Sequence, residues 1–152
     1  MEISQKYLKE AIKNIQIADH MIYVTFPLIN EKRLLLKTFE EIYKSIINCI
    51  YSLLYYEKML GRIIIYENKN DNLETFFNIA KKYNLTNQQL KKIKEIIDIN
   101  NKHEQSAIEF VKKEKLIMMS DTLRIRSIDL FILKEYLLVA KEFLMLLSKK
   151  YR

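Results

Sequence analysis

The chain contains one proline, Pro27, and one glycine, Gly61, and this scarcity restricts it to folds built from helices. Proline has no backbone N–H and ends a helix at or before the preceding residue, whereas glycine readily adopts the left-handed conformation that follows a helix. We therefore expect a first helix from Glu2 to about Thr25, followed by a turn at Pro27. A second helix should open with Asn30 as its cap and close at Gly61. Glycine-dependent sites, namely phosphate-binding loops, dinucleotide fingerprints and nucleophile elbows, are excluded.

The predicted second helix, residues 31–60, has more apolar surface than one side of a surface helix carries. One stripe at helical spacing consists of Leu35, Phe39, Ile42, Ile46, Leu53 and Leu60, and an adjoining stripe consists of Tyr43, Ile47, Ile50 and Leu54. Such a helix either lies at the centre of a bundle or packs against a second subunit. From this width we expect a homodimer formed through residues 31–60.

The rest of the chain predicts three further helices and one hairpin. Residues 62–67 are rich in β-branched side chains and residues 68–72 are polar, which favours a loop. A short helix should then cover residues 73–82. Thr86 and Gln89 stand at capping-box spacing and should open a helix that ends near Lys102. Alternating residues between positions 106 and 127 predict a small β-hairpin, after which Asp129 begins the last helix.

The fold class is therefore mainly α: an antiparallel bundle of four to five helices with a small β-hairpin before the C-terminal helix. The chain of 152 residues, 49% of them apolar, is long enough to bury a core as one domain over residues 1–152.

A net charge of +7 and a pI of about 9.3 favour acidic partners such as RNA, DNA or anionic lipid, although a compositional bias toward lysine explains the same values. The hairpin would bring together the densest cationic group, which consists of Lys112, Lys113, Lys115, Arg124 and Arg126. Arg124 and Arg126 would share one face of the hairpin, which makes them the better candidates for phosphate contacts. Ordinary solvated side chains are the alternative for this group.

A second cationic group and several tyrosines are also typical of nucleic-acid binding, because cations contact phosphates and aromatic rings stack on bases. The group consists of Lys81, Lys82, Lys91, Lys92 and Lys94, and the tyrosines are Tyr55, Tyr56, Tyr66 and Tyr83.

His103 is the candidate for a catalytic role. It is predicted at the fraying end of a helix, where a histidine would carry protons near neutral pH; the alternative is a solvated histidine that interacts with the helix dipole. Neither His20 nor His103 follows an acid by three residues, which excludes the Glu-x-x-His pairs of di-iron bundles. The lone Cys49 lies in an apolar run and should be a buried, inert thiol. We expect no metal and no cofactor.

The location of the protein is predicted from three negative features. The first residues lack the pattern of a signal peptide. The apolar stretches at residues 46–56 and 130–147 are respectively too short and too interrupted by charges to cross a bilayer. A single cysteine forms no internal disulfide, as is typical of proteins in a reducing compartment. We therefore expect a cytoplasmic protein without a membrane partner.

Two parts of the chain carry a resemblance to a known family. They are residues 19–28 leading into residues 33–40, and residues 106–117 followed by residues 124–128. In these segments and in the order of its predicted elements, the chain resembles the HEPN class of helical bundles, including small archaeal proteins of that class. Many HEPN proteins are RNases that use an arginine and a histidine separated by four to six residues, usually paired across a dimer.

That RNase motif is absent here. The three eligible positions before His103 hold Ile96, Ile97 and Asp98, and those before His20 hold Lys13, Asn14 and Ile15. The resemblance therefore implies a non-catalytic dimer or binding module.

Three functions follow from these observations as expectations. The first is a non-enzymatic module that binds RNA or a ribonucleoprotein through the hairpin cations. The second is a divergent HEPN-type ribonuclease or nucleotide-binding enzyme that uses His103. The third is a protein-binding adaptor or antitoxin-like partner, in which another chain covers the apolar surface of residues 31–60.

Overall fold

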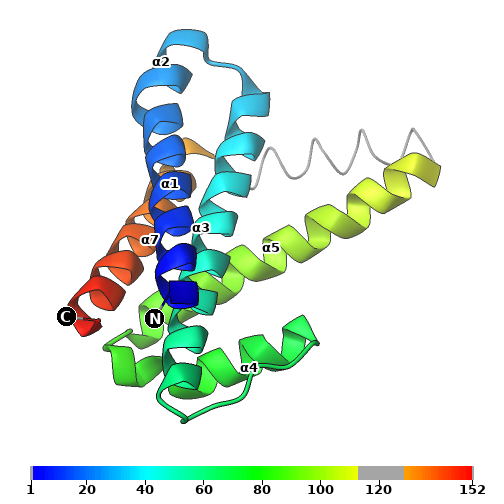
Figure 1. Cartoon of the computed structure of the whole chain (residues 1–152). Helices are drawn as coiled ribbons and strands as arrows, with labels where there is room; N and C mark the ends of the chain where they lie inside the picture. The colour runs from blue at the N-terminus through cyan, green and yellow to red at the C-terminus, as the bar shows by residue number, and fades with distance from the viewer. Residues whose placement is uncertain (1, 113–128, 152) are drawn as a thin grey trace.

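A computed structural model describes residues 2–112 and 129–151, with side chains described for residues 2–102 and 129–151. The regular structure within these residues is helical, which confirms the predicted mainly helical bundle. The elements in chain order are α1 (Glu2–His20), the π-helical turn η1 (Met21–Thr25), α2 (Phe26–Ile29), α3 (Lys32–Met59), α4 (Lys69–Ile79), the 3₁₀-helical turn η2 (Ala80–Tyr83), α5 (Asn87–Lys112) and α7 (Leu130–Lys150). Figure 1 shows α1, α3 and α7 side by side, with α4 and α5 crossing them.

α1 and α3 form an antiparallel helical hairpin that polar side chains hold in register. Near the middle of the pair, the Asn14 side-chain amide donates to Glu41 Oε2 (3.0 Å) and accepts from Asn48 Nδ2 (2.8 Å). Near the open end, the hydroxyls of Ser4 and Ser52 each donate to the other residue's backbone carbonyl at 2.8 Å. Because buried polar groups are costly without partners, these bonds favour one register of α1 on α3 over its neighbours.

α3 is the central helix of the bundle, and it contacts α1, α4, α5 and α7. Of its two predicted stripes, Leu35, Phe39, Ile42, Ile46, Ile50, Leu53 and Leu54 are buried, Tyr43 and Ile47 are half-buried, and Leu60, just past the helix, is exposed. The width of the apolar surface is therefore explained by burial within one chain. This corrects the basis of the homodimer predicted through residues 31–60, since the surface that was to bind a second subunit is already covered.

Pro27 does not end the first helical segment, contrary to the prediction. The chain stays helical to Ile29, because η1 inserts a wide turn in which the Phe26 N–H donates to the Met21 carbonyl five residues back. A π turn gives the proline ring the room that a regular α-helix denies it. The segment ends at Asn30, which adopts a left-handed conformation (φ 51°) and closes α2. Asn30 is therefore a C-terminal cap, and Glu31 precedes α3 instead.

Gly61 ends α3 as the sequence predicts. Its φ is +73°, its N–H donates to the Lys58 carbonyl (2.9 Å), and the next N–H, of Arg62, donates to the Glu57 carbonyl (3.0 Å). These two bonds form a Schellman motif, which satisfies the last carbonyls of the helix.

The loop predicted after Gly61 is shorter than expected, because α4 begins at Lys69 and not near residue 73. The Asn68 side chain caps it by accepting the Asn70 N–H (2.8 Å). Asn72, in the first turns of α4, anchors the loop by accepting from the Tyr66 N–H and donating to the Tyr66 carbonyl, both at 2.8 Å. Two asparagines of the polar run, Asn68 and Asn72, thus act as a helix cap and as an anchor for the loop. Composition alone does not distinguish such asparagines from those of an ordinary loop.

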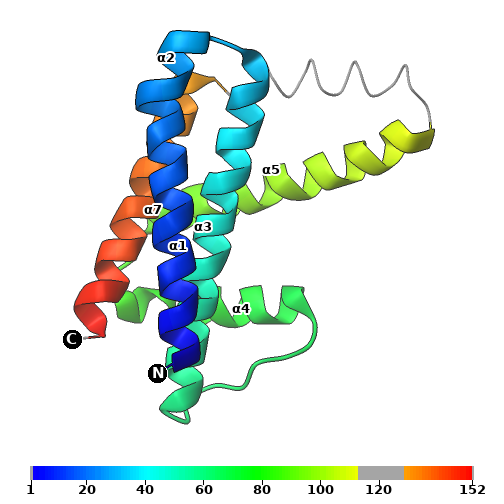
Figure 2. The same cartoon turned by 45° about the horizontal axis from the view of Figure 1, so that its top comes forward.

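α5 opens as predicted and extends further than predicted. Gln89 N–H donates to the Thr86 hydroxyl (3.1 Å), and Thr86 N–H donates to the Gln89 side-chain carbonyl (2.9 Å), which forms the capping box. The helix continues past Lys102 to Lys112, because neither glycine nor proline interrupts residues 103–112. Figures 1 and 2 both show its C-terminal half leading away from α1, α3 and α7.

The predicted β-hairpin falls mostly on residues 113–128, which lie outside the described residues. Residues 106–112, expected to break the helical pattern, belong to α5 instead, and residues 2–112 and 129–151 contain no strand. After the hairpin segment, Asp129 caps α7 as predicted, because its side chain accepts the Ile132 N–H at 2.8 Å.

The Gly61 cap leads to a stability prediction. A Cβ on Gly61 would meet no atom within 4 Å, so Gly61→Ala should cost only the backbone penalty of a left-handed residue, about 1 kcal/mol in the free energy of unfolding. Asn84, the left-handed residue after η2 (φ 64°), provides the control, since Asn84→Gly should cause no loss. Urea unfolding of both variants tests this, and an unchanged Gly61→Ala would contradict the cap.

Candidate functional site

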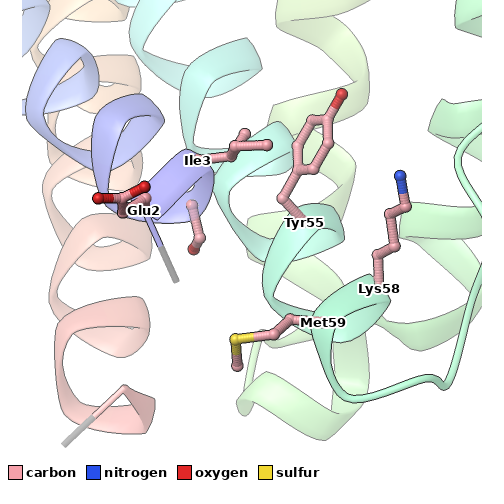
Figure 3. A pocket seen from close by; sticks show the side chains of 6 residues that line it. Glu2, Ile3, Tyr55, Lys58 and Met59 are labelled. Carbon is pink, nitrogen blue, oxygen red and sulfur yellow. The ribbon is translucent and has the colours of Figure 1, made fainter.

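A shallow groove opens where the first turn of α1 meets the last turns of α3 (Figure 3). Its volume is about 510 Å³, and its lining residues are Glu2, Ile3, Ser4, Tyr55, Lys58 and Met59. The ammonium group of Lys58 and the hydroxyl of Tyr55 extend away from the backbone of α3, while Glu2 lies across the opening on α1. The groove therefore combines an apolar floor with one cationic and one anionic side chain.

Three tyrosines beside this groove stack on one another. The Tyr7 ring lies 5.7 Å from the Tyr51 ring and 5.5 Å from the Tyr55 ring, and Lys58 Nζ lies 5.7 Å from the centroid of Tyr55. Burial, and then the neighbouring Tyr55 and Tyr51, raise the pKa of Tyr7. Because Tyr7 and Lys58 both pack against the Tyr55 ring, this aromatic side chain has little open face on which a base would stack.

A buried polar network lies beneath the groove. Ser4 and Ser52 bond each other as described above, and Tyr151, just after α7, lies 2.9 Å from the Ser52 hydroxyl. Since the Ser52 proton is already donated to Ser4, the Tyr151 hydroxyl acts as the donor. Burial is the main reason that the pKa of Tyr151 rises to about 12. The network ties α1, α3 and the end of α7 together.

A second buried polar group lies at the same end of the bundle. Glu57 is fully buried, and its Oε2 accepts from the Arg62 guanidinium at 3.0 Å. Its Oε1 and the buried hydroxyl of Tyr83 have no hydrogen-bond partner among the described residues. Burial and then the charge of Glu57 raise the pKa of Tyr83. A buried carboxylate oxygen and a buried phenol without a hydrogen-bond partner are uncommon in a protein interior. Tyr83 itself is only 2% exposed, so it is a core residue and not a surface ring for stacking.

Exposed lysines surround this end of the bundle. Lys81 and Lys82 belong to η2, Lys149 and Lys150 to the last turn of α7, and all four are exposed. Lys150 Nζ lies 5.7 Å from the centroid of Tyr83, which places the end of α7 against η2. Figures 1 and 2 show the C-terminus of α7 close to the segment between α4 and α5. We refer to Lys81, Lys82, Lys149 and Lys150 as the basic end.

The structure divides the predicted second cationic group. Lys81 and Lys82 join the basic end, whereas Lys91, Lys92 and Lys94 lie on α5. Lys92 forms an ion pair with Glu135 of α7 (3.8 Å). Of the tyrosines predicted for stacking, Tyr56 stacks on Tyr151 (4.5 Å) and Tyr66 is exposed.

The roles predicted for the primary site residues stay predictions. Lys113, Lys115, Arg124 and Arg126 lie outside the described residues. His103 and Lys112 belong to α5, beyond the described side chains of that helix. His103 thus lies within a continuous helix, which corrects its predicted place at a fraying helix end.

The described residues provide neither a metal site nor a helix that could span a membrane. Residues 2–102 and 129–151 hold no group of histidine, cysteine and carboxylate side chains suited to a metal ion. No helix of the described chain combines the length and apolar character needed to cross a bilayer. Cys49 is fully buried as predicted, and burial raises the pKa of its thiol, so the reactive thiolate is disfavoured.

The unpartnered Tyr83 hydroxyl predicts an unusual mutational effect. Tyr83→Phe removes a buried polar atom without a described partner and should raise the free energy of unfolding by about 1 kcal/mol. Tyr151→Phe is the matched control, because it removes the hydrogen bond to Ser52 and should lower that free energy by about 1 kcal/mol.

Denaturant unfolding of the two variants in parallel shows whether their free energies of unfolding change in opposite directions. If Tyr83→Phe were as destabilising as Tyr151→Phe, the Tyr83 hydroxyl would have to be hydrogen-bonded in solution.

Comparison with known proteins adds no assignment. No protein-family model matches the chain, and neither a curated protein nor a solved structure matches it significantly. The resemblance to HEPN bundles is therefore neither supported nor contradicted by known proteins.

Proposed function

We propose that this protein is a non-enzymatic helical module that binds RNA, alone or within a ribonucleoprotein, and that the basic end forms part of the binding surface. The observation that carries the proposal is the gathering of Lys81, Lys82, Lys149 and Lys150 at one end of the bundle. Arg62 adds a half-exposed guanidinium nearby, and its carboxylate partner Glu57 is buried. Such a surface attracts phosphates, because neutralising them releases counterions.

The lysines of the basic end have a structural role as well. Lys149 and Lys150 stand in the last turn of α7, where cations interact favourably with the helix dipole. That role does not explain why lysines of two separate elements, η2 and α7, gather at the same end of the bundle. The cations predicted at residues 112–126, with Arg124 and Arg126 foremost, would supply a second phosphate-binding group.

A relationship with HEPN bundles belongs to the same proposal. Two long antiparallel helices, α1 and α3, come first, the shorter α4 follows, and the long α7 comes last, as that resemblance implies. The helix between α4 and α7 departs from it, because α5 has 26 residues where a second short helix was expected. The Arg-x₄₋₆-His motif of HEPN RNases is absent from the sequence, and this favours binding over cleavage.

RNA titration at two salt concentrations tests the proposal. A structured RNA should bind, and the affinity should fall steeply between about 50 and 200 mM salt. Substituting all four lysines of the basic end by glutamine should reduce the salt slope by about 0.7–0.9 for each phosphate contact that is lost. Arg124→Gln with Arg126→Gln should reduce it further.

A second quartet of exposed lysines provides the matched control. Lys9, Lys13, Lys32 and Lys37 lie on α1 and the first turns of α3, and their replacement by glutamine removes the same charge. The control quartet should leave the salt slope nearly unchanged. Absence of binding, binding without salt dependence, or equal effects of the two quartets would contradict the proposal. Cleavage of the RNA that His103→Ala abolishes would favour the ribonuclease alternative.

A further inference from the structure

The outer face of α7 carries a line of exposed apolar side chains. Phe131, Leu138 and Met145 are 68%, 57% and 58% exposed. Their seven-residue spacing aligns them along one side of the helix over about 21 Å. The opposite side of α7 is buried in the core through residues such as Leu133 and Leu137. We refer to Phe131, Leu138 and Met145 as the α7 stripe.

Charged residues of opposite sign flank the α7 stripe. At about 100° per residue, Lys134 and Lys141 lie about 40–60° to one side of the stripe, and Glu135 and Glu142 lie about 40–60° to the other. The stripe therefore separates a lysine side from a glutamate side.

Neighbouring elements hold these charged residues in place. On the lysine side, Lys141 bonds Asp19 of α1 (2.5 Å), and the ammonium groups of Lys134 and Lys141 lie 5.5 and 5.9 Å from the centroid of Tyr23. On the glutamate side, Glu135 pairs with Lys92 of α5 (3.8 Å), and Glu142 accepts from Gln89 (2.9 Å). The charge pattern is thus part of the folded surface.

We propose that a second copy of this chain docks on the α7 stripe, with the two α7 helices parallel and related by a twofold axis along them. Such an axis places the lysine side of one helix against the glutamate side of the other at the same height. Lys134 would then meet Glu135 of the second copy, and Lys141 would meet Glu142. An antiparallel pair would instead place lysines against lysines and glutamates against glutamates, which is destabilising.

The size of the α7 stripe determines the strength of the contact. Three apolar side chains and their flanks bury little area, and interfaces below about 1,200 Å² belong to weak complexes. The expected dimer is therefore reversible and depends on protein concentration. It involves the surface of α7 and leaves α3, through which the sequence predicted a dimer, inside each subunit.

Sedimentation of the full chain over a range of concentrations tests whether the dimer forms. The protein should shift from monomer to dimer as its concentration rises, and Leu138→Glu should weaken association at least about tenfold, because two like charges would meet at the axis. Ile64→Glu, at an equally exposed apolar side chain in the loop before α4, is the control and should leave association unchanged. A monomer at all concentrations, or equal effects of the two variants, would overturn the proposal.

Cysteine cross-linking tests the orientation. Parallel helices place position 145 opposite itself, so Met145→Cys should form a disulfide-linked dimer under mild oxidation. The native Cys49 is buried, and Ile64→Cys should remain monomeric. If Met145→Cys failed to cross-link while a mixture of Phe131→Cys and Met145→Cys did so, the helices would be antiparallel and the proposed geometry would be wrong.

Discussion

The burial of α3 on several sides by the rest of its own chain is the constraint on which this structure depends. α1 covers one side along its length, α7 another, and α4 and α5 cross it, so that Ile42, Ile46 and Leu53 are fully buried. Each buried side chain of this size contributes about 1.5–3 kcal/mol of hydrophobic free energy, which makes the helix the main source of stability. Polar bonds such as those of Asn14 and Ser4 add little to that sum, but they decide how α1 lies against α3.

The burial of α3 also explains which apolar and cationic groups lie on the surface. Within the described residues the apolar side of α3 is covered, an exposed apolar line runs along α7, and the lysines of the basic end gather where η2 meets the end of α7. The functional proposals concern different surfaces: RNA at the basic end and a second copy at the α7 stripe. Failure of either one leaves the other intact.

Sequence patterns predicted those parts of the fold that depend on neighbouring residues. The Gly61 cap, the Thr86–Gln89 capping box and the Asp129 cap each involve side chains and backbone within a few positions. The errors had two causes. At Pro27 a π turn overrides the local preference and keeps the proline within a helical segment. At residues 103–112 the local sequence contains no helix breaker, and α5 continues where a break was expected. The Glu57–Arg62–Tyr83 group and the Ser4–Ser52–Tyr151 network were not predicted. Ser4, Ser52 and Tyr151 come from elements far apart in the sequence. Arg62 is only five residues from Glu57, but Tyr83 joins that pair from the separate element η2. The sequence did contain a partial signal for the first group, because a glutamate such as Glu57 among apolar residues of a central helix indicates a buried partner.

Hydrogen exchange of backbone amides tests the central role of α3 most directly. Amides within residues 35–54 should be the slowest to exchange in the protein, and their protection should be the same at low and high protein concentration, because the covering helices belong to the same chain. Rapid exchange in these residues, or protection that appears only as the concentration rises, would contradict this account and return the apolar surface of α3 to a subunit interface.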